Sequence, residues 1–136
     1  THFVIEGDPK VSILIPNKDH TEDLNKCVTS ILERSTWKNI QIIVIENNSE
    51  KEETFHYYEE LEKRYPQAKV VTWDGPFNYS AINNFGAKYA DGDYLLLLNN
   101  DTEVITPEWL GNMMGYCQRE PSSFTRIIRF SMLVSW

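Results

Sequence analysis

Four apolar runs, each followed by apolar residues at helical spacing, are the feature that most restricts the fold of this chain. The runs are rich in Val, Ile and Leu without strict alternation, which is typical of strands buried on both faces of a parallel sheet. Strands and helices in strict order form right-handed βαβ units, so the sequence predicts an α/β fold with a mostly parallel sheet flanked by helices. The predicted strands are residues 11–15, 41–46, 69–73 and 94–98.

An amphipathic helix is expected after each strand. Pro66 ends the second helix, and Asn78 or Ser80 is available to cap the third. The fourth is expected to begin at Thr106, with Pro107 at its first helical position. The expected buried faces are Leu24, Cys27, Val28, Ile31 and Leu32; Phe55, Tyr58, Leu61 and Tyr65; Ile82, Phe85, Gly86 and Tyr89; and Trp109, Leu110, Met113 and Met114.

Length and charge limit the class of protein further. The chain has 136 residues, which suits one domain, and a formal net charge of −7. An acidic chain lacks the basic surface that a general nucleic-acid binder needs. Cys27 and Cys117 are expected to be reduced thiols, because two isolated cysteines form neither a disulfide scaffold nor a zinc site. With no transmembrane segment or signal peptide in the sequence, a soluble cytoplasmic domain is expected.

The last sixteen residues differ in composition from the rest of the chain. All 20 acidic residues lie at or before Glu120, and none follows it. Two hypotheses fit residues 121–136: a fifth strand added to the edge of the sheet, or a non-native tail that replaces the rest of a larger domain. The residues that alternate as in a strand are Phe124, Ile128, Phe130, Met132, Val134 and Trp136.

Polar residues stand at the carboxyl end of every predicted strand, where open parallel sheets bind their ligands. Each group also has a simpler interpretation, because Asn, Asp and Ser end strands by satisfying the backbone groups of turns. The groups are Pro16-Asn17-Lys18, Glu46-Asn47-Asn48-Ser49, Trp73-Asp74 and Asn99-Asn100-Asp101.

The group Asn99-Asn100-Asp101 suggests chemistry most strongly. A carboxylate at the end of a central strand can ligate a hard divalent ion whose other ligands are phosphate oxygens and water, and such an ion acts as a Lewis acid on a leaving diphosphate. Glu46 would repel a phosphate but could accept a hydrogen bond from a base or a ribose. No GxGxxG or GxxxxGK[ST] motif occurs, which argues against a dinucleotide-binding Rossmann domain and excludes a P-loop.

Five segments, in order and at the right spacing, resemble family 2 glycosyltransferases of the GT-A fold, over about residues 10–120. The resemblance implies a nucleotide-sugar donor, Mn²⁺ or Mg²⁺ as cofactor, and transfer of the sugar to an acceptor with inversion. The segments are VSILIPN (11–17), CVTSIL (27–32), IIVIENNS (42–49), FNYSAINNFG (77–86) and YLLLLNNDTE (94–103).

The resemblance also assigns roles to single residues. Asn17 and Glu46 would contact the base, Asn99 would contact the ribose or the sugar, and Asp101 would be the metal ligand. Asn84 matches the Asn two residues before the Gly in the helix that precedes the metal-binding strand. The full nucleotide-binding set expected on this basis is Pro16, Asn17, Glu46, Asn48, Asp74, Asn84, Asn99 and Asn100.

Two positions depart from the family pattern. Asn83 replaces the usual Arg, and Asn99 replaces the first Asp of the DXD motif. Losing one carboxylate should weaken metal affinity, although an amide still hydrogen-bonds sugar hydroxyls. The variants FNYS and NND resemble members that build bacterial cell-surface polysaccharides, including rhamnosyltransferase-like ones. A UDP- or dTDP-sugar donor and a glycan or lipid-linked acceptor at the inner face of the membrane are therefore expected.

The family places its general base in the second half of the domain, which would follow Glu120. Residues 1–120 are therefore expected to form the nucleotide-binding region, and no catalytic base is assigned within this chain, which alone should be inactive. The alternative is a non-catalytic nucleotide-binding module of the same fold. A flavodoxin-like signalling domain is disfavoured, because it needs an acidic cluster after its first strand and Pro16-Asn17-Lys18 provides none.

Overall fold

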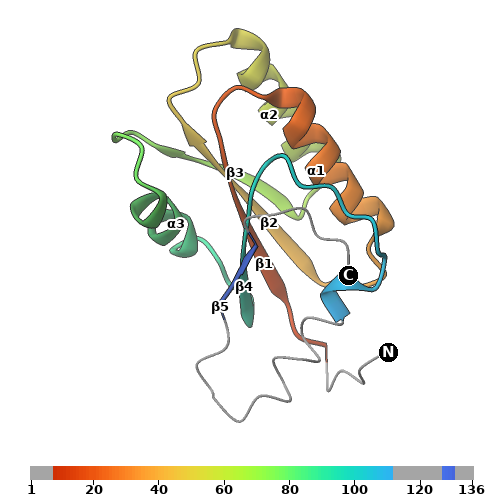
Figure 1. Ribbon diagram of the computed structural model, residues 1–136. Helices are drawn as coiled ribbons and strands as arrows, with labels where there is room; N and C mark the ends of the chain where they lie inside the picture. Colours follow the sequence, from red (N-terminus) through yellow and green to blue (C-terminus); the bar gives the residue numbers. More distant parts are fainter. Residues whose placement is uncertain (1–7, 112–126, 131–136) are drawn as a thin grey trace.

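The computed structural model describes residues 8–111 and 127–130, and these fold into one parallel sheet with helices on both faces (Figure 1). Each predicted strand and the first three predicted helices are present. In chain order the elements are β1 (Val11–Asn17), α1 (Thr21–Arg34), β2 (Ile40–Asn47), α2 (Glu52–Arg64), β3 (Ala68–Trp73), α3 (Tyr79–Ala87), β4 (Tyr94–Leu98) and β5 (Ile127–Phe130).

The strands lie in the order β3-β2-β1-β4-β5, and every neighbouring pair is parallel. The chain therefore builds outward from β1 to β2 and β3, then crosses back to place β4 on the other side of β1. Val11 lies opposite both Ile40 and Tyr94, so three strands begin in register. The reversal makes the gap between β1 and β4 a topological switch point, where the loops at the carboxyl ends diverge and leave room for a ligand.

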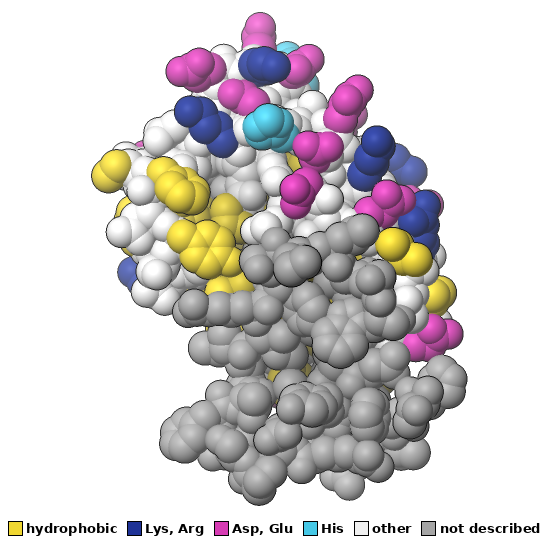
Figure 2. All heavy atoms as spheres, viewed as in Figure 1, with side chains coloured by type: hydrophobic (Ala, Val, Ile, Leu, Met, Phe, Trp, Pro, Cys, Tyr) yellow, Lys and Arg dark blue, Asp and Glu magenta, His cyan; other side chains and the backbone are white. Residues whose placement is uncertain are grey.

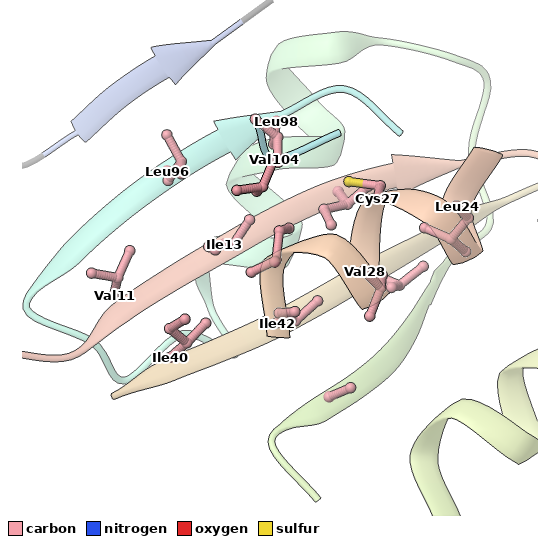
Figure 3. Packing of buried hydrophobic residues seen from close by; sticks show 14 of the residues in the cluster. Val11, Ile13, Leu24, Cys27, Val28, Ile40, Ile42, Leu96, Leu98 and Val104 are labelled. Carbon is pink, nitrogen blue, oxygen red and sulfur yellow. The ribbon is translucent and has the colours of Figure 1, made fainter. Parts of the chain in front are cut away.

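The two faces of the sheet have separate cores. Side chains alternate along β1, so Ile13 and Ile15 pack with α1 while Leu14 packs in the cluster beneath α3. Figure 3 shows Leu24, Cys27 and Val28 of α1 seated on the first of these cores. β1 and β2 thus contribute apolar side chains to both faces of the sheet, which explains why their sequences are nearly continuous hydrophobic segments.

A glycine determines how closely α3 approaches the sheet. A Cβ atom added at Gly86 would lie 2.4 Å from Ile45 Cδ1, so a larger residue there would displace the Ile45 side chain. Asn78 caps the helix, because its side chain accepts a hydrogen bond from the Ala81 amide at 2.9 Å. One of the two predicted caps is thereby confirmed.

Two expected boundaries were wrong. Pro16 lies within β1, which runs on to Asn17; β4 pairs with β1 only through Leu14, so the missing amide of Pro16 interrupts no bond to β4. The fourth helix begins at Trp109, after a turn at Pro107, and the Trp109 amide bonds the carbonyl of Thr106 at 3.2 Å.

Some expected buried residues are exposed. Trp109 and Leu110 are buried as predicted, but Phe55 is 45% exposed because α2 buries a narrower face than the sequence pattern suggested, and Tyr89 is 40% exposed because it lies in the turn after α3, which ends at Ala87. Met113 and Met114 lie outside the described residues.

Part of the compositionally distinct tail forms a strand. β5 pairs with β4 at the edge of the sheet, with Ile127 opposite Leu95. The remaining tail positions and Cys117 lie outside the described residues, and the domain boundary at Glu120 stays a prediction. Cys27 is buried and carries a free thiol. Among the described helices, none has the length and apolar composition needed to cross a membrane.

Candidate functional site

The carboxyl ends of β1 and β4 are joined by a direct side-chain contact across the switch point. Asn100 Nδ2 donates to Asn17 Oδ1 at 2.8 Å, although the two residues are 83 positions apart in the chain. Asn17 is buried, and Asn100 is half-buried in the loop that follows β4. Two of the predicted strand-end groups are thus held together in space.

The contact continues into the interior through α2. Asn17 Nδ2 donates to the Tyr58 hydroxyl at 2.9 Å, and that hydroxyl donates to Glu46 Oε1 at 2.8 Å. Burial is the main cause that raises the pKa of Tyr58, so the phenol keeps its proton at neutral pH and acts as a donor. Tyr58 was expected in the core; its polar contacts were not.

Glu46 is buried near the carboxyl end of β2. Only 3% of the residue is exposed, and its carboxylate accepts hydrogen bonds from Tyr58, from the Ser49 amide at 2.8 Å and from the Ser49 hydroxyl. These donors satisfy the hydrogen-bonding capacity of the buried carboxylate without a cation. Its expected contact with a base stays a prediction, because Glu46 does not line the cavity at this edge.

Asp19 organises the neighbouring loop, a role that the sequence did not indicate. Its carboxylate accepts from the amides of Glu50 and Lys51 and from the Thr54 hydroxyl, at 3.0–3.1 Å to Oδ1. These bonds, the one from Lys51 above all, lower the pKa of Asp19. Asp19 thereby satisfies backbone donors at the start of α2, which has no cap from its own N-cap side chain.

A cavity of about 450 Å³ opens at this edge, beside the switch point. It combines an aromatic ring that is 70% exposed, that of Phe77, with amide groups that both donate and accept, and with a lysine. Such a surface suits a flat heteroaromatic ring bearing polar edges. The lining residues are Pro16, Asn17, Lys18, Asn47, Asn48 and Phe77.

Three of these six residues, Pro16, Asn17 and Asn48, belong to the nucleotide-binding set expected from the sequence, and the other three, Lys18, Asn47 and Phe77, do not. Asn47 and Asn48 support each other, since Asn48 Nδ2 donates to Asn47 Oδ1 at 2.9 Å and to the Gly75 carbonyl at 3.1 Å. The second bond joins the end of β2 to the loop that carries Phe77. Alternation along β2 was an available signal: it turns Glu46 toward the α1 face and Asn47 toward the opposite one.

The loop after β4 is anchored to α1. Thr102 N bonds the carbonyl of Asn99 at 3.2 Å to close a turn over residues 99–102, and the Cys27 thiol lies 3.8 Å from the same carbonyl. Farther along, Val104 N donates to Ser30 Oγ at 2.9 Å. Asp101 is exposed at the tip of this turn. Burial, and then the charge of Asp101, raise the pKa of Cys27 to about 12.

The donor set for a metal is small. Within residues 8–111 no cluster of three or more His, Cys, Asp or Glu side chains could hold an ion. Asp101 supplies one accessible carboxylate on an anchored turn, and Asn99 brings an amide oxygen two residues away. This set fits a hard divalent ion only where phosphate and water supply most of the ligands.

The other two predicted residues lie apart from this cavity. Asn84 lines a second cavity of about 250 Å³ between α3 and β4, together with Asn83. Asn83 Nδ2 bonds the Tyr79 carbonyl at 2.9 Å, while its buried Oδ1 has no hydrogen-bond partner in the described part of the chain. Asp74 is exposed in the turn after β3 and lines neither cavity.

A parallel sheet covered on both faces, with a cavity at the carboxyl ends of β1 and β2, is typical of the α/β proteins that bind ligands at the carboxyl ends of their strands. The model of the family described as Glycosyl transferase family 2 matches residues 12–134. This chain belongs to glycosyl transferase family 2. The fold expected from the resemblance is thereby confirmed.

Two relatives are similar over most of this chain. It is 42% identical over 117 residues to O-antigen biosynthesis protein RfbC of Myxococcus xanthus, covering 86% of this chain and 9% of the relative. It is 39% identical over 115 residues to uncharacterized protein y4gI of Sinorhizobium fredii (strain NBRC 101917 / NGR234), covering 85% and 13%. The chain thus spans only a small part of the length of both curated relatives.

A solved structure shares the fold. The mannosyltransferase PcManGT from Pyrobaculum calidifontis, solved in complex with GDP-Man and Mn²⁺, matches 85% of this chain and 34% of its own with a TM-score of 0.74. The two sequences are only 13% identical, so the match concerns the arrangement of strands and helices.

Proposed function

We propose that this chain is the donor-binding part of a glycosyltransferase that takes a nucleoside diphosphate sugar. The observation that carries the proposal is the bond between Asn17 and Asn100, which holds a cavity suited to a base beside the turn that presents Asp101. Similarity to an O-antigen biosynthesis protein supports a role of the longer protein in polysaccharide synthesis.

In this proposal the base enters the cavity against the Phe77 ring, and the amides of Asn47 and Asn48 meet its polar edge. An amide both donates and accepts, so it can pair with the edge of uracil, thymine or guanine. The diphosphate then extends over the carboxyl end of β1 toward the turn at residues 99–102. Lys18 lines the cavity and adds a positive charge on this path.

Charge explains why a divalent ion belongs to the proposal. The chain carries a formal net charge of −7, so a diphosphate needs a cation to approach Asp101. Asp101 would hold Mn²⁺ or Mg²⁺ with help from Asn99, and the bound ion would supply Lewis-acid stabilisation of the departing diphosphate. The chain's own residues bind and orient the donor; transfer to a glycan or lipid-linked acceptor, with inversion, completes the proposed reaction at the cytoplasmic face of the membrane.

Calorimetric titration with UDP, dTDP and GDP, each with and without Mn²⁺, tests this function. We expect metal-dependent binding of one nucleotide, reduced at least about tenfold in Asp101→Ala because one charged ligand is lost. The matched control is Asp91→Ala, which removes an exposed carboxylate that pairs with Lys10 at the opposite end of the sheet. Equal binding by both variants, or no binding of any nucleotide by the folded wild type, would refute the proposal.

A second candidate is a nucleotide-binding module that has lost catalysis, which the amides at Asn83 and Asn99 favour. The longer protein decides between the two. Metal-dependent hydrolysis or transfer of its sugar donor would exclude the module, whereas tight nucleotide binding without turnover would support it.

A further inference from the structure

We propose that Tyr58, on α2, is a positioning residue of the donor site: its hydroxyl fixes the orientation of the Asn17 amide and, through it, the turn that carries Asp101. The role of Tyr58 in donor binding rests on the proposed function, whereas the hydrogen bonds that support the inference are independent of that function. Tyr58 lines neither cavity at the carboxyl edge, so it acts through Asn17.

The direction of each hydrogen bond follows from chemistry. The Glu46 carboxylate has only acceptors, so the Tyr58 hydroxyl must donate to it, at 2.8 Å. The oxygen of that hydroxyl is then an acceptor toward Asn17 Nδ2, at 2.9 Å. With its amino group turned inward, Asn17 directs its carbonyl oxygen to the outside, where Asn100 Nδ2 donates to it at 2.8 Å.

A flipped Asn17 amide would break this sequence of bonds. Its amino group would face the amino group of Asn100, and two donors cannot bond each other. Asn17 Nδ2 has one other acceptor, the Asp19 carbonyl at 3.4 Å, which is near the limit for a hydrogen bond. The Tyr58 hydroxyl is therefore the main group that selects one of the two amide orientations.

This orientation matters at two places in the site. Asn17 lines the cavity, so the amide orientation determines whether a ligand meets an oxygen or a nitrogen there. Asn100 is the middle residue of Asn99-Asn100-Asp101, so its bond to Asn17 holds the turn at a fixed distance from β1. Tyr58 is itself held in place, with its ring edge-on to Phe55 at 5.9 Å between centroids.

Tyr58→Phe tests the proposal, with Tyr57→Phe as the matched control. Tyr57 directly precedes Tyr58 on α2, and its hydroxyl donates to Asn25 of α1 rather than to Asn17. Side-chain amide signals of Asn17 and Asn100, and backbone hydrogen exchange at residues 99–102, are measured by NMR without any ligand. We expect both to change in Tyr58→Phe and neither in Tyr57→Phe, because only the Tyr58 hydroxyl bonds Asn17, which in turn bonds Asn100 in the turn.

A titration with Mn²⁺ and the nucleotide that binds best supplies the functional readout. We expect Tyr58→Phe to weaken metal-dependent binding about tenfold, equivalent to one hydrogen bond of about 1.4 kcal/mol, and the control to bind as the wild type does. Loss of general stability alone would not change the affinity of the folded fraction. Unchanged amide signals and exchange in Tyr58→Phe would overturn the proposal.

Glu46→Gln keeps the test decisive if Tyr58→Phe does not fold. Gln has nearly the shape of Glu but can donate to the Tyr58 oxygen, so the phenol no longer needs to donate inward and the Asn17 amide loses its fixed direction. We expect altered Asn17 and Asn100 signals; unaltered ones would overturn the proposal. A wild type that binds no nucleotide refutes the donor-binding function instead, because the ligand-free NMR comparison still decides what Tyr58 does.

Discussion

The amino ends and the carboxyl ends of the parallel strands carry the same kinds of polar residue, but these residues make different contacts at the two ends. At the amino edge, Asp93 accepts from the Lys10 amide at 2.9 Å, Asp91 pairs with the Lys10 ammonium at 2.8 Å, and Ser12 accepts from Gly92 at 2.9 Å. These contacts close the turn before β4. At the carboxyl edge the comparable side chains are buried in a continuous network that borders a cavity.

The comparison teaches that residue type does not separate turn-forming from ligand-binding groups. A strand-end Asp or Asn that bonds its neighbours in solvent is sufficiently explained by the turn. Burial of Asn17 and Glu46 costs desolvation free energy. Their hydrogen bonds also extend beyond β1 and β2, to Tyr58 on α2 and to Asn100 in the loop after β4. Many charged side chains on the surface over α1 and α2 face solvent and belong to neither group (Figure 2).

The largest expected difference between the edges is in stability. Glu46→Ala leaves buried donors of Tyr58 and Ser49 without an acceptor, and we expect it to lower the free energy of unfolding by about 3 kcal/mol. Asp91→Ala removes an exposed ion pair and should change it by less than about 0.5 kcal/mol. Urea denaturation measures both. Similar values for the two variants would remove the distinction between the edges.

Exposed aromatic residues allow a second test, in binding. Phe77 lies at the carboxyl edge, and Tyr89 lies at the amino edge, where its carbonyl accepts from Gln41. We expect Phe77→Ala to weaken nucleotide binding about tenfold, because stacking on a base contributes about 1–3 kcal/mol. Tyr89→Ala should leave affinity unchanged. Calorimetry measures the affinity of both variants. A larger loss of affinity in Tyr89→Ala than in Phe77→Ala would contradict the proposal that the base binds in the cavity beside Phe77.

The smallest expected effect concerns acid stability. The pKa of Asp19 is lowered from its ordinary value of 3.8 in the folded chain, so its contribution to stability is present above that pH and is lost as the pH falls through the lowered value. Asp19→Asn should therefore flatten the dependence of the melting temperature on pH between about 2 and 4. Melting curves across this range check it, and an unchanged slope would mean that other groups set the acid limit.

Local sequence patterns predicted the strands because their apolar runs lie in the sheet, with β1 and β2 buried almost throughout, and predicted three helices because each has an apolar face that packs on the sheet. They failed where the answer depends on a distant strand. Pro16 fits within β1 only because β4 stops pairing at Leu14, which the sequence near Pro16 cannot reveal. Phe55 has the spacing of a core residue, yet the helix turns it partly toward solvent.

The sequence predicted where the candidate site lies more completely than it predicted which residues line the cavity. The sequence predicted that Asn17, Asn48 and Asn100 lie together at the carboxyl ends of the strands, and the structure places them there, because parallel strands share one carboxyl edge. Phe77 was missed because it lies four residues beyond the end of β3, in the segment that leads to α3, and reaches the cavity through a fold-dependent contact of that segment with the end of β2. The bonds among Asn17, Tyr58 and Asn100 join residues that no sequence spacing relates.

The strand order has a consequence for biosynthesis. β1, β2 and β3 follow one another in the chain and lie side by side, so they can pair as soon as they leave the ribosome. The Asn17–Asn100 bond closes a loop of 83 residues, and it forms only when β4 has been made and has docked on the far side of β1. Until β4 has been made, the nascent chain therefore holds an incomplete sheet in which one side of β1 is unpaired, and the proposed donor site is among the last parts of residues 8–111 to form.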